Sequence, residues 1–201
     1  MLVDRSFADA VVLALPRGGV PVGFEVATAL RAPLDVFVVR KVGAPHQPEM
    51  GIGAVAEGGT EVVDRRLLRA VGVSDETFAE LADRERVELQ RRVTRYRGAR
   101  PLPDVAGRDV VLVDDGLATG VTAEAALLAL RAGGPRALHL AVPACAAESA
   151  ERLRQIADDV VCVTTPSAFR AVGEWYDVFD QTTDDEVTEL LERAGRVVDR
   201  W

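Results

Sequence analysis

Residues 110–122 constrain the fold of this chain more than any other stretch. Four apolar residues, Val110–Val113, precede two adjacent carboxylates, Asp114 and Asp115, and a turn of small residues then leads into a helix expected at Ala123–Arg131. A short run rich in β-branched residues is typical of a strand buried on both faces of a parallel sheet. The same order of strand, acidic residue, turn and helix is common in open α/β sheets without any special function. The stretch therefore predicts, first of all, an α/β fold.

The turn also has the chemistry of an anion-binding loop. Thr119 and Thr122 carry hydroxyls that can donate to phosphate oxygens, and Gly120 lets the backbone approach a ligand closely. Because the first amides and the dipole of the following helix favour negative charge, we expect a phosphate here. The ionised carboxylates of Asp114 and Asp115 only accept hydrogen bonds, which suits two neighbouring hydroxyls of a ribose.

The rest of the sequence alternates between apolar strands and helices. Strands are expected at Val11–Leu15, Leu34–Val39, Asp109–Val113, Ala137–Val142 and Val160–Val163. Helices between several of these strands are expected at Pro21–Arg31, Ala123–Arg131 and Glu148–Ala157. This alternation predicts an α/β protein with a doubly wound parallel sheet of about five strands and flanking helices.

Two segments do not follow that alternation. Ser74–Arg97 is predicted to be one long, highly charged helix with a thin apolar stripe. One interpretation is a solvated helix laid across the core. The alternative is a functional helix, which would form part of a hood over the site or the contact of a homodimer. The second segment, Phe169–Trp201, ends in an acidic helix expected near Asp184–Ala194. We expect one domain over residues 1–201, with small hood elements from 43–105 and 166–201.

Four aromatic residues lie in the second of these segments, after the last core strand. They are Phe169, Trp175, Tyr176 and Phe179. Their rings either stack a nucleobase or fasten the C-terminal segment to the sheet. For stacking, Tyr176 is the first choice, because a phenol also offers a polar edge.

Composition narrows the function classes. The 201 residues carry a net charge of −8, which gives no reason to expect a nucleic-acid partner. No apolar run reaches the roughly 18 residues that span a membrane, and no signal peptide is visible at the N-terminus. The only cysteines, Cys145 and Cys162, lie in apolar surroundings without metal-ligand spacing. We expect them to be reduced core thiols of a cytoplasmic protein.

A second candidate anion loop follows the first expected strand. In Pro16–Pro21 an arginine precedes two glycines at a strand-to-helix turn. The amides of Gly18 and Gly19 can face an anion while the guanidinium of Arg17 forks onto it. A glycine-rich turn with a surface arginine is the alternative for this loop alone.

Two cations and a glycine-rich segment follow the second expected strand. Arg40 and Lys41 end that strand and are expected to point into the crevice where ligands bind, unless they form a solvated pair. Gly43–Gly51 is predicted to be a mobile loop, in which His46 is more typical of a solvated side chain than of a catalytic one. Glu57, beside a turn, could contact substrate but is better explained as a structural acid.

Together these motifs resemble the type I phosphoribosyltransferases over about residues 11–180. Asp114–Thr122 matches the family's signature for phosphoribosyl pyrophosphate (PRPP) nearly position by position, and Pro16–Gly19 resembles its pyrophosphate loop. Gly43–Gly51 lies where the family has a flexible hood loop that shields the reacting centre from water. Gly116 departs from the usual aliphatic residue. Ala118 stands where 6-oxopurine enzymes often have an aspartate, so the loop looks more like adenine-type loops.

The resemblance implies an activity and a set of roles. The expected reaction is Mg2+-dependent attack of a nitrogen acceptor, usually a nucleobase, on the anomeric carbon of PRPP, with loss of pyrophosphate. The implied catalytic residues are Asp114, Asp115, Arg17 and Lys41, and both aspartates would also hold the metal, through water. The implied PRPP-binding residues are Gly18, Gly19, Arg40, Ala118, Thr119, Gly120, Val121 and Thr122.

Two further expectations come with the resemblance. In this family the peptide bond after the residue equivalent to Arg17 is often cis. Some members bind PRPP without turnover, as regulators, usually with a nucleic-acid-binding surface. The negative charge and the lack of a basic helix speak against that surface here.

Overall fold

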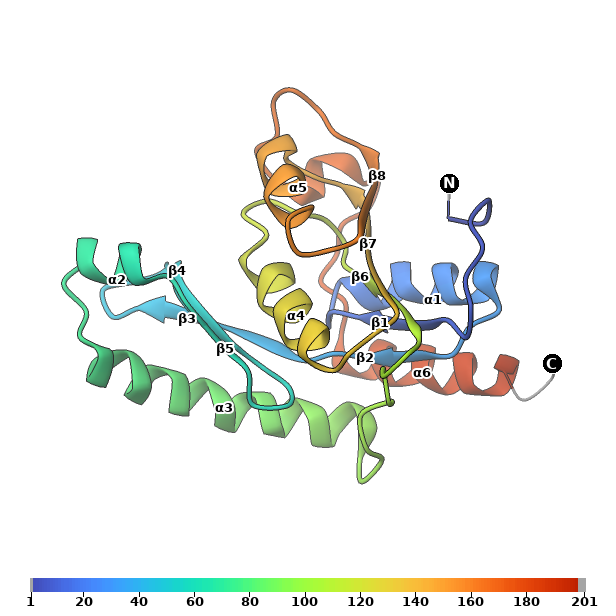
Figure 1. Cartoon of the computed structure of the whole chain (residues 1–201), viewed down its shortest axis with the longest axis horizontal. Helices are drawn as coiled ribbons and strands as arrows, with labels where there is room; N and C mark the ends of the chain where they lie inside the picture. Colours follow the sequence, from blue (N-terminus) through green and yellow to red (C-terminus); the bar gives the residue numbers. More distant parts are fainter. Residues whose placement is uncertain (1, 199–201) are drawn as a thin grey trace.

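The computed structural model of the chain describes residues 2–198 (Figure 1). Its centre is a parallel sheet of five strands in the order β2-β1-β6-β7-β8. The strands are β1 (Val11–Ala14), β2 (Leu34–Val36), β6 (Asp109–Val113), β7 (Ala137–Ala144) and β8 (Asp159–Thr164). Helices flank this sheet, so the α/β class and the parallel sheet of about five strands are confirmed.

The neighbouring strands β1 and β6 are apolar except for Asp109, the first residue of β6, because both of their faces are covered. Val11 pairs with Val110 and Ala14 with Val113, and every residue of the two strands is buried. Alternate residues serve different cores: Leu13 packs in the core that contains α4 residues, whereas Val12 packs in the one that contains α1 residues. Period-two alternation across a two-sided sheet explains why these strands read as unbroken apolar runs.

Helices cover both faces of the sheet (Figure 1). One face carries α4 and α5, which contribute Leu127 and Leu153 to its core. The other face carries α1, which contributes Ala27. The bounds are α1 (Gly19–Leu30), α4 (Val121–Ala132) and α5 (Ala147–Leu153). None of the helices within residues 2–198 has the length and apolar character needed to cross a membrane.

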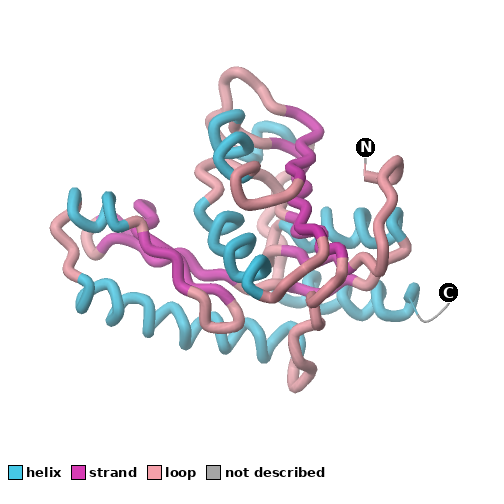
Figure 2. The backbone as a smooth tube through the Cα atoms, in the orientation of Figure 1, coloured by secondary structure: helices cyan, strands magenta, loops and turns pink. Residues whose placement is uncertain are grey.

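A second, antiparallel sheet extends away from the central one as an arm (Figures 1 and 2). The arm consists of β3 (Val39–Ala44), β4 (Gln47–Ala56), β5 (Glu61–Val63), α2 (Arg65–Ala70) and α3 (Asp75–Arg97). Ser74 caps α3 by accepting a hydrogen bond of 3.1 Å from the amide of Thr77. Phe78 and Leu89 on the apolar stripe of α3 are buried in the same core as Ile52 of β4. The long charged helix therefore packs on one narrow face, as predicted.

Arg97, at the end of α3, ties the arm to the central sheet. Its buried guanidinium donates to the carbonyl of Val36 at 2.6 Å and to the carboxylates of Asp35 and Glu57. Glu57 in turn accepts the amide of Val38 at 3.3 Å. These groups hold residues 36–38, where the chain leaves one sheet and enters the other. Glu57 is thus a structural acid.

The C-terminal segment returns to the central domain. A short 3-10 helix, η1 (Val172–Trp175), precedes α6 (Asp184–Val198), which packs against α1 and α3. Val187 and Leu191 of α6 are buried in the core that contains the α3 residues. The aromatic rings cluster in pairs: Phe169 stacks on Trp175 at 6.5 Å between ring centroids, and Tyr176 lies 5.1 Å from Phe179.

Three expectations about local structure are wrong. The run predicted as one strand, Leu34–Val39, is divided between two sheets, because Phe37 donates to Ala14 of the central sheet and Val39 already pairs with Ala56 of the arm. An apolar run does not reveal where a chain changes sheets.

The predicted mobile loop, Gly43–Gly51, is a β-hairpin instead. Ala44 pairs with Gln47 across a two-residue turn, and Gly43 pairs with Gly51 at an irregular register. A side chain at Gly43 would come within 2.3 Å of the carbonyl oxygen of Pro48. The glycines therefore permit close strand approach rather than a loop.

The two cysteines are not free thiols. Cys145, directly after β7, is joined to Cys162 of β8 by a disulfide, which corrects the expectation of reduced core thiols. Strands β7 and β8 are neighbours, which brings the two sulfur atoms together. Spacing in the sequence could not show this pairing.

Candidate active site

The candidate site lies where β1 and β6 end side by side, at the carboxyl edge of the sheet. The amide of Leu15 donates to the carbonyl of Val113 at 2.9 Å, which aligns the turn after β1 with the acidic pair after β6. A Cβ atom built on Gly18 would lie 1.9 Å from Oδ2 of Asp115, and one on Gly19 would lie 2.9 Å from Cα of Asp114. Only glycine permits this approach, so the two motifs form one site.

The first turn carries a cis peptide bond between Pro16 and Arg17. The expected cis bond was the one after Arg17, so the expectation is wrong by one position. Helix α1 starts directly after this turn, and no side chain caps its N-terminus at Gly18. Within this turn the amides of Gly19 and Val20 donate to the carbonyls of Leu15 and Arg17, both at 3.1 Å.

The acidic pair is partly buried at the end of β6. Burial and the neighbouring charge of Asp115 raise the pKa of Asp114 well above its ordinary value. Burial also raises the pKa of Asp115. The backbone amide of Asp115 donates to Oδ1 of Asp114 at 2.9 Å, which fixes one carboxylate against the turn. Two carboxylates this close favour a cation or hydroxyl donors between them.

The loop after the acidic pair is anchored to β7 and opens a second uncapped helix. Leu117 donates to the carbonyl of Ala144 at 2.9 Å and accepts from the amide of Ala146 at 2.8 Å. Gly120, at the N-terminus of α4, has φ of 68°, a left-handed conformation that favours glycine, and no side chain caps the helix there. The exposed residue Thr119 precedes it and the partly buried Thr122 follows it. The free amides at such a helix N-terminus can bind an anion.

A cavity of 820 Å³ opens beside the acidic pair. It is lined by the Arg17 loop, by Arg92 of α3 and by residues 176–182 of the C-terminal segment, and Asp115 forms part of its wall. Nη1 of Arg17 lies 3.9 Å from Oδ1 of Asp184, the first residue of α6. The cavity therefore adjoins the Arg17 turn and Asp115, and the rings of Tyr176 and Phe179 form part of its wall.

The C-terminal segment packs directly on the loop after β6. A Cβ atom on Gly116 would lie 2.6 Å from Cγ1 of Val172 in η1. The phenolic oxygen of Tyr176 donates to the backbone carbonyl of Asp115 at 2.6 Å. An aliphatic residue at position 116 would displace η1, which accounts for the glycine found there.

Comparison with known proteins adds the family to this geometry. Residues 4–178 match the family model described as a phosphoribosyl transferase domain. The chain belongs to the phosphoribosyl transferase domain family. The site described above lies at the carboxyl edge of the family's parallel sheet, inside the matched residues except for the end of the C-terminal segment.

Two kinds of relatives accompany the family match. The chain is 48% identical over 195 residues to "Putative phosphoribosyl transferase Rv0571c" of Mycobacterium tuberculosis (strain ATCC 25618 / H37Rv), covering 97% of this chain and 44% of that protein. It thus spans less than half the length of this curated relative. The crystal structure of TT1426 from Thermus thermophilus shares 46% identity with a TM-score of 0.80, covering 94% of this chain and 89% of that one.

The acidic pair of this phosphoribosyl transferase domain fits Mg2+, the metal expected with PRPP. The ion typically takes one or two carboxylates and completes its shell with water and substrate oxygens. Asp114 and Asp115 supply two carboxylates whose pKa values are raised by burial, so a cation would stabilise their ionised forms. Within residues 2–198 no cluster of three or more metal-ligating side chains occurs, so the remaining ligands would be oxygens from water and substrate.

The structure separates the two cations of β3. The aliphatic part of Lys41 lies over Gly51, whose own added Cβ would be 3.8 Å from Val121 at the start of α4. Lys41 thus lies near the start of α4, where the loop Ala118–Thr122 leads into the helix. Nε of Arg40 donates instead to Oε2 of Glu85 on α3 at 2.8 Å. Of the candidate site residues, Arg40 shares a hollow with Lys41 only, separate from the cavity that Arg17, Gly18 and Asp115 line.

Several site residues escaped sequence reasoning. Tyr96 of α3 donates to Oδ1 of Asp184 at 2.6 Å, so the carboxylate near Arg17 is held from the arm as well. Ser149 and Arg152 of α5 donate to the carbonyls of Ala118 and Thr119 in the loop after β6. No local pattern could indicate these contacts, because the partners lie 30 or more positions apart.

Proposed function

We propose that this chain transfers the ribose 5-phosphate group of PRPP to a nitrogen acceptor and releases pyrophosphate. The observation that carries the proposal is the close approach of Gly18 to the carboxylate of Asp115. The proposal is supported by the neighbouring strands β1 and β6, each followed by a turn and by a helix without a side-chain cap, α1 and α4. A turn suited to an anion on each of two neighbouring strands, with Asp114 and Asp115 between them in the role of diol acceptors, would suit a ribose. That ribose would carry phosphate at one end and pyrophosphate at the other.

Each part of the site has a proposed role. The loop of Ala118–Thr122 would hold the 5′-phosphate, through its amides and the hydroxyls of Thr119 and Thr122. Asp114 and Asp115 would accept the ribose 2′- and 3′-hydroxyls and hold Mg2+ through water. Arg17, Gly18, Gly19 and Lys41 would contact the pyrophosphate. For Arg40 the ion pair with Glu85 supports a structural role instead.

The reaction needs positioning and electrostatics rather than a protein nucleophile. The bond between the anomeric carbon and the pyrophosphate oxygen breaks, and a bond from the acceptor nitrogen to that carbon forms. Positive charge develops on the ribose and negative charge on the departing oxygen. Mg2+ would neutralise the pyrophosphate. The side chain of Arg17 would stabilise the charge growing on the same group, and Asp115 would face the ribose.

The acceptor would bind in the cavity beside Asp115. Its wall includes Tyr176 and Phe179, whose planar rings suit a nucleobase. We also propose that the arm within residues 43–105 and the segment 166–201 act together as the hood over this cavity. Such a hood would exclude water from the reacting centre.

The test is a screen for PRPP consumption and pyrophosphate release with Mg2+, over nucleobases and small amines. The proposal predicts turnover with at least one nitrogen acceptor, and loss of turnover in Asp115→Asn. PRPP binding without turnover across the screen would point to the regulatory alternative. Absence of PRPP binding would refute both.

A further inference from the structure

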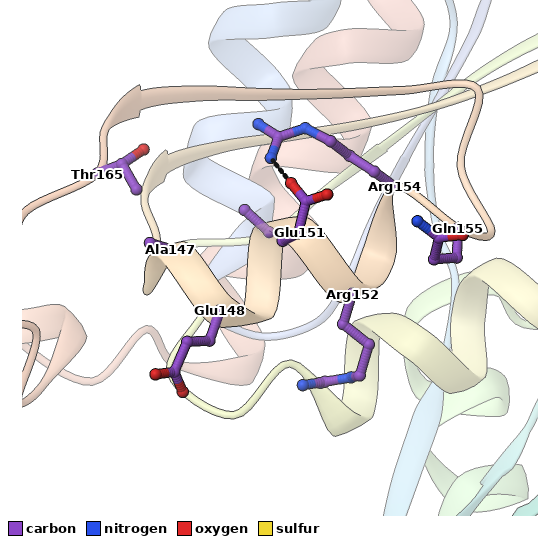
Figure 3. A pocket seen from close by; sticks show the side chains of 8 residues that line it. Ala147, Glu148, Glu151, Arg152, Arg154, Gln155 and Thr165 are labelled. Atoms are coloured by element: carbon purple, nitrogen blue, oxygen red, sulfur yellow. Dashed lines mark hydrogen bonds and ion pairs between the residues drawn. The ribbon is translucent and has the colours of Figure 1, made fainter.

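Two side chains of α5 hold two successive carbonyl groups of the loop Ala118–Thr122, called the phosphate loop below because it is proposed to hold the 5′-phosphate. Oγ of Ser149 donates to the carbonyl of Ala118 at 2.6 Å, and Nη2 of Arg152 donates to the carbonyl of Thr119 at 2.5 Å. Ser149 and Arg152 are three positions apart, so they share one face of the helix. Figure 3 shows Arg152 extending from α5 toward this loop, on the opposite side of the helix from Arg154.

The contacts are themselves fixed. Nε of Arg152 donates to Oε2 of Glu124 on α4 at 3.1 Å, so its guanidinium links α5, the loop and α4. Ser149 is only 4% exposed. A Cβ atom on Gly120 would lie 3.3 Å from Nη2 of Arg152, so guanidinium and loop are in close contact.

We infer that Ser149 and Arg152 are positioning residues for the 5′-phosphate. The inference rests on the proposed function. The only cis bond among the described residues is Pro16–Arg17, so the two loop peptides are trans, with N–H and C=O pointing in opposite directions. Holding the carbonyls of Ala118 and Thr119 toward α5 directs the amides of Thr119 and Gly120 away from it, as phosphate donors.

Arg152 acts through the loop rather than as a ligand of the phosphate. Its guanidinium is already engaged by the carbonyl of Thr119 and balanced by the carboxylate of Glu124. A preformed set of amides needs no reorganisation when the phosphate binds. The free loop without these contacts would have to lose backbone freedom on binding, which weakens affinity.

The test compares two ligands that use different parts of the site. Ribose 5-phosphate probes the loop after β6, and magnesium pyrophosphate probes the turn around Arg17. Calorimetric titration of Ser149→Ala and Arg152→Met should show ribose 5-phosphate binding weakened about tenfold in each. Pyrophosphate binding should stay within about twofold of wild type. In turnover, KM for PRPP should rise while kcat at saturating PRPP is kept.

Conservative and control variants separate positioning from stability. Ser149→Thr keeps the hydroxyl and should restore binding. Arg154→Met is the matched control at the C-cap of the same helix, because Arg154 forms an exposed ion pair with Glu151 at 3.0 Å (Figure 3). Its affinities for both ligands should equal those of wild type.

Three outcomes would overturn the inference. Unchanged ribose 5-phosphate affinity in both variants would show that the contacts do not position the loop. Equal weakening of both ligands, together with a lower melting temperature, would show a general structural role. Wild-type protein that binds neither ribose 5-phosphate nor PRPP would refute the proposed function itself, and the inference with it.

Discussion

The phenolic oxygen of Tyr176 donates a 2.6 Å hydrogen bond to the backbone carbonyl of Asp115. This bond fastens the C-terminal segment to the acidic pair at the end of β6. It also engages the polar edge that made Tyr176 the first choice for stacking a base. The neighbouring ring of Phe179 is 48% exposed and lies 5.1 Å away, so it is the better candidate for contacting an acceptor.

Tyr176→Phe should therefore act on stability. Loss of this single hydrogen bond is expected to lower the free energy of unfolding by about 1 kcal/mol. Burial first, and then the charges of Asp115 and Asp114, raise the pKa of Tyr176 to about 12. The contribution of this hydrogen bond to the free energy of unfolding should thus be complete below a pH of about 10. It should be lost as the pH rises toward 12. Urea unfolding at pH 7.5 measures it, and an unchanged midpoint would contradict the fastening role.

Phe179→Ala should act on the acceptor instead. Loss of a stacking ring costs about 1–3 kcal/mol in base binding. PRPP affinity should be unchanged, because the two turns proposed to bind its phosphate groups lie at the strand ends rather than in the C-terminal segment. Titration of both ligands into one variant tests this. Joint weakening of both ligands would show that the ring belongs to the packing of the segment.

Gly18→Ala should disable the site without unfolding the domain. The added methyl group would lie 1.9 Å from Oδ2 of Asp115, so the carboxylate must move away from the turn. We expect PRPP affinity to fall at least tenfold. Gly195→Ala on α6 is the control, because nothing lies within 4 Å of the added Cβ atom. It should bind PRPP normally and gain up to about 1 kcal/mol in stability. A Gly18→Ala variant that binds PRPP with wild-type affinity would show that the two motifs do not form one site.

Asp114→Asn should stabilise the free protein while it weakens binding of Mg2+ and PRPP. Burial and the charge of Asp115 raise the pKa of Asp114 well above its ordinary value, so the folded state favours the protonated form. The stability that the wild-type protein gains from protonated Asp114 is complete below the pKa that Asp114 has in the unfolded chain. It is lost as the pH rises through the pKa of Asp114 in the folded protein. The stability of Asp114→Asn relative to wild type should therefore grow with pH, by at most about 1.4 kcal/mol per pH unit. Urea unfolding between pH 4 and 8 checks the slope, and a constant difference would contradict it.

The parts of the fold that the sequence predicts well are those governed by burial and by local chemistry. Asp109–Val113 is a strand with the predicted bounds, because a strand covered on both faces must be apolar at nearly every position. Ser74 begins the long helix as predicted, because its hydroxyl satisfies a free amide of the first turn. The acidic pair and the Arg17 turn come together as expected for two adjacent strand ends.

The parts that failed depend on contacts between distant residues. Nothing local to Leu34–Val39 shows that Val39 pairs with Ala56 in another sheet. The glycines at 43 and 51 suggested a loop, whereas they face each other across a hairpin. The placement of Arg40 against Glu85 could not be predicted either, since neighbouring residues of a strand point to opposite faces and only the packing of α3 decides which face is the site.

Thermal unfolding with and without magnesium PRPP tests the central claim most directly. A ligand at one hundred times its dissociation constant adds about 2.7 kcal/mol of stability, which corresponds to a rise of roughly 5–10 °C in melting temperature for a domain of this size. We predict that rise for wild type. In Asp115→Asn we predict a much smaller rise, because loss of a charge-assisted hydrogen bond weakens binding about ten- to one-hundredfold. A wild-type melting temperature unchanged by millimolar PRPP and Mg2+, or an equal rise in Asp115→Asn, would contradict the account.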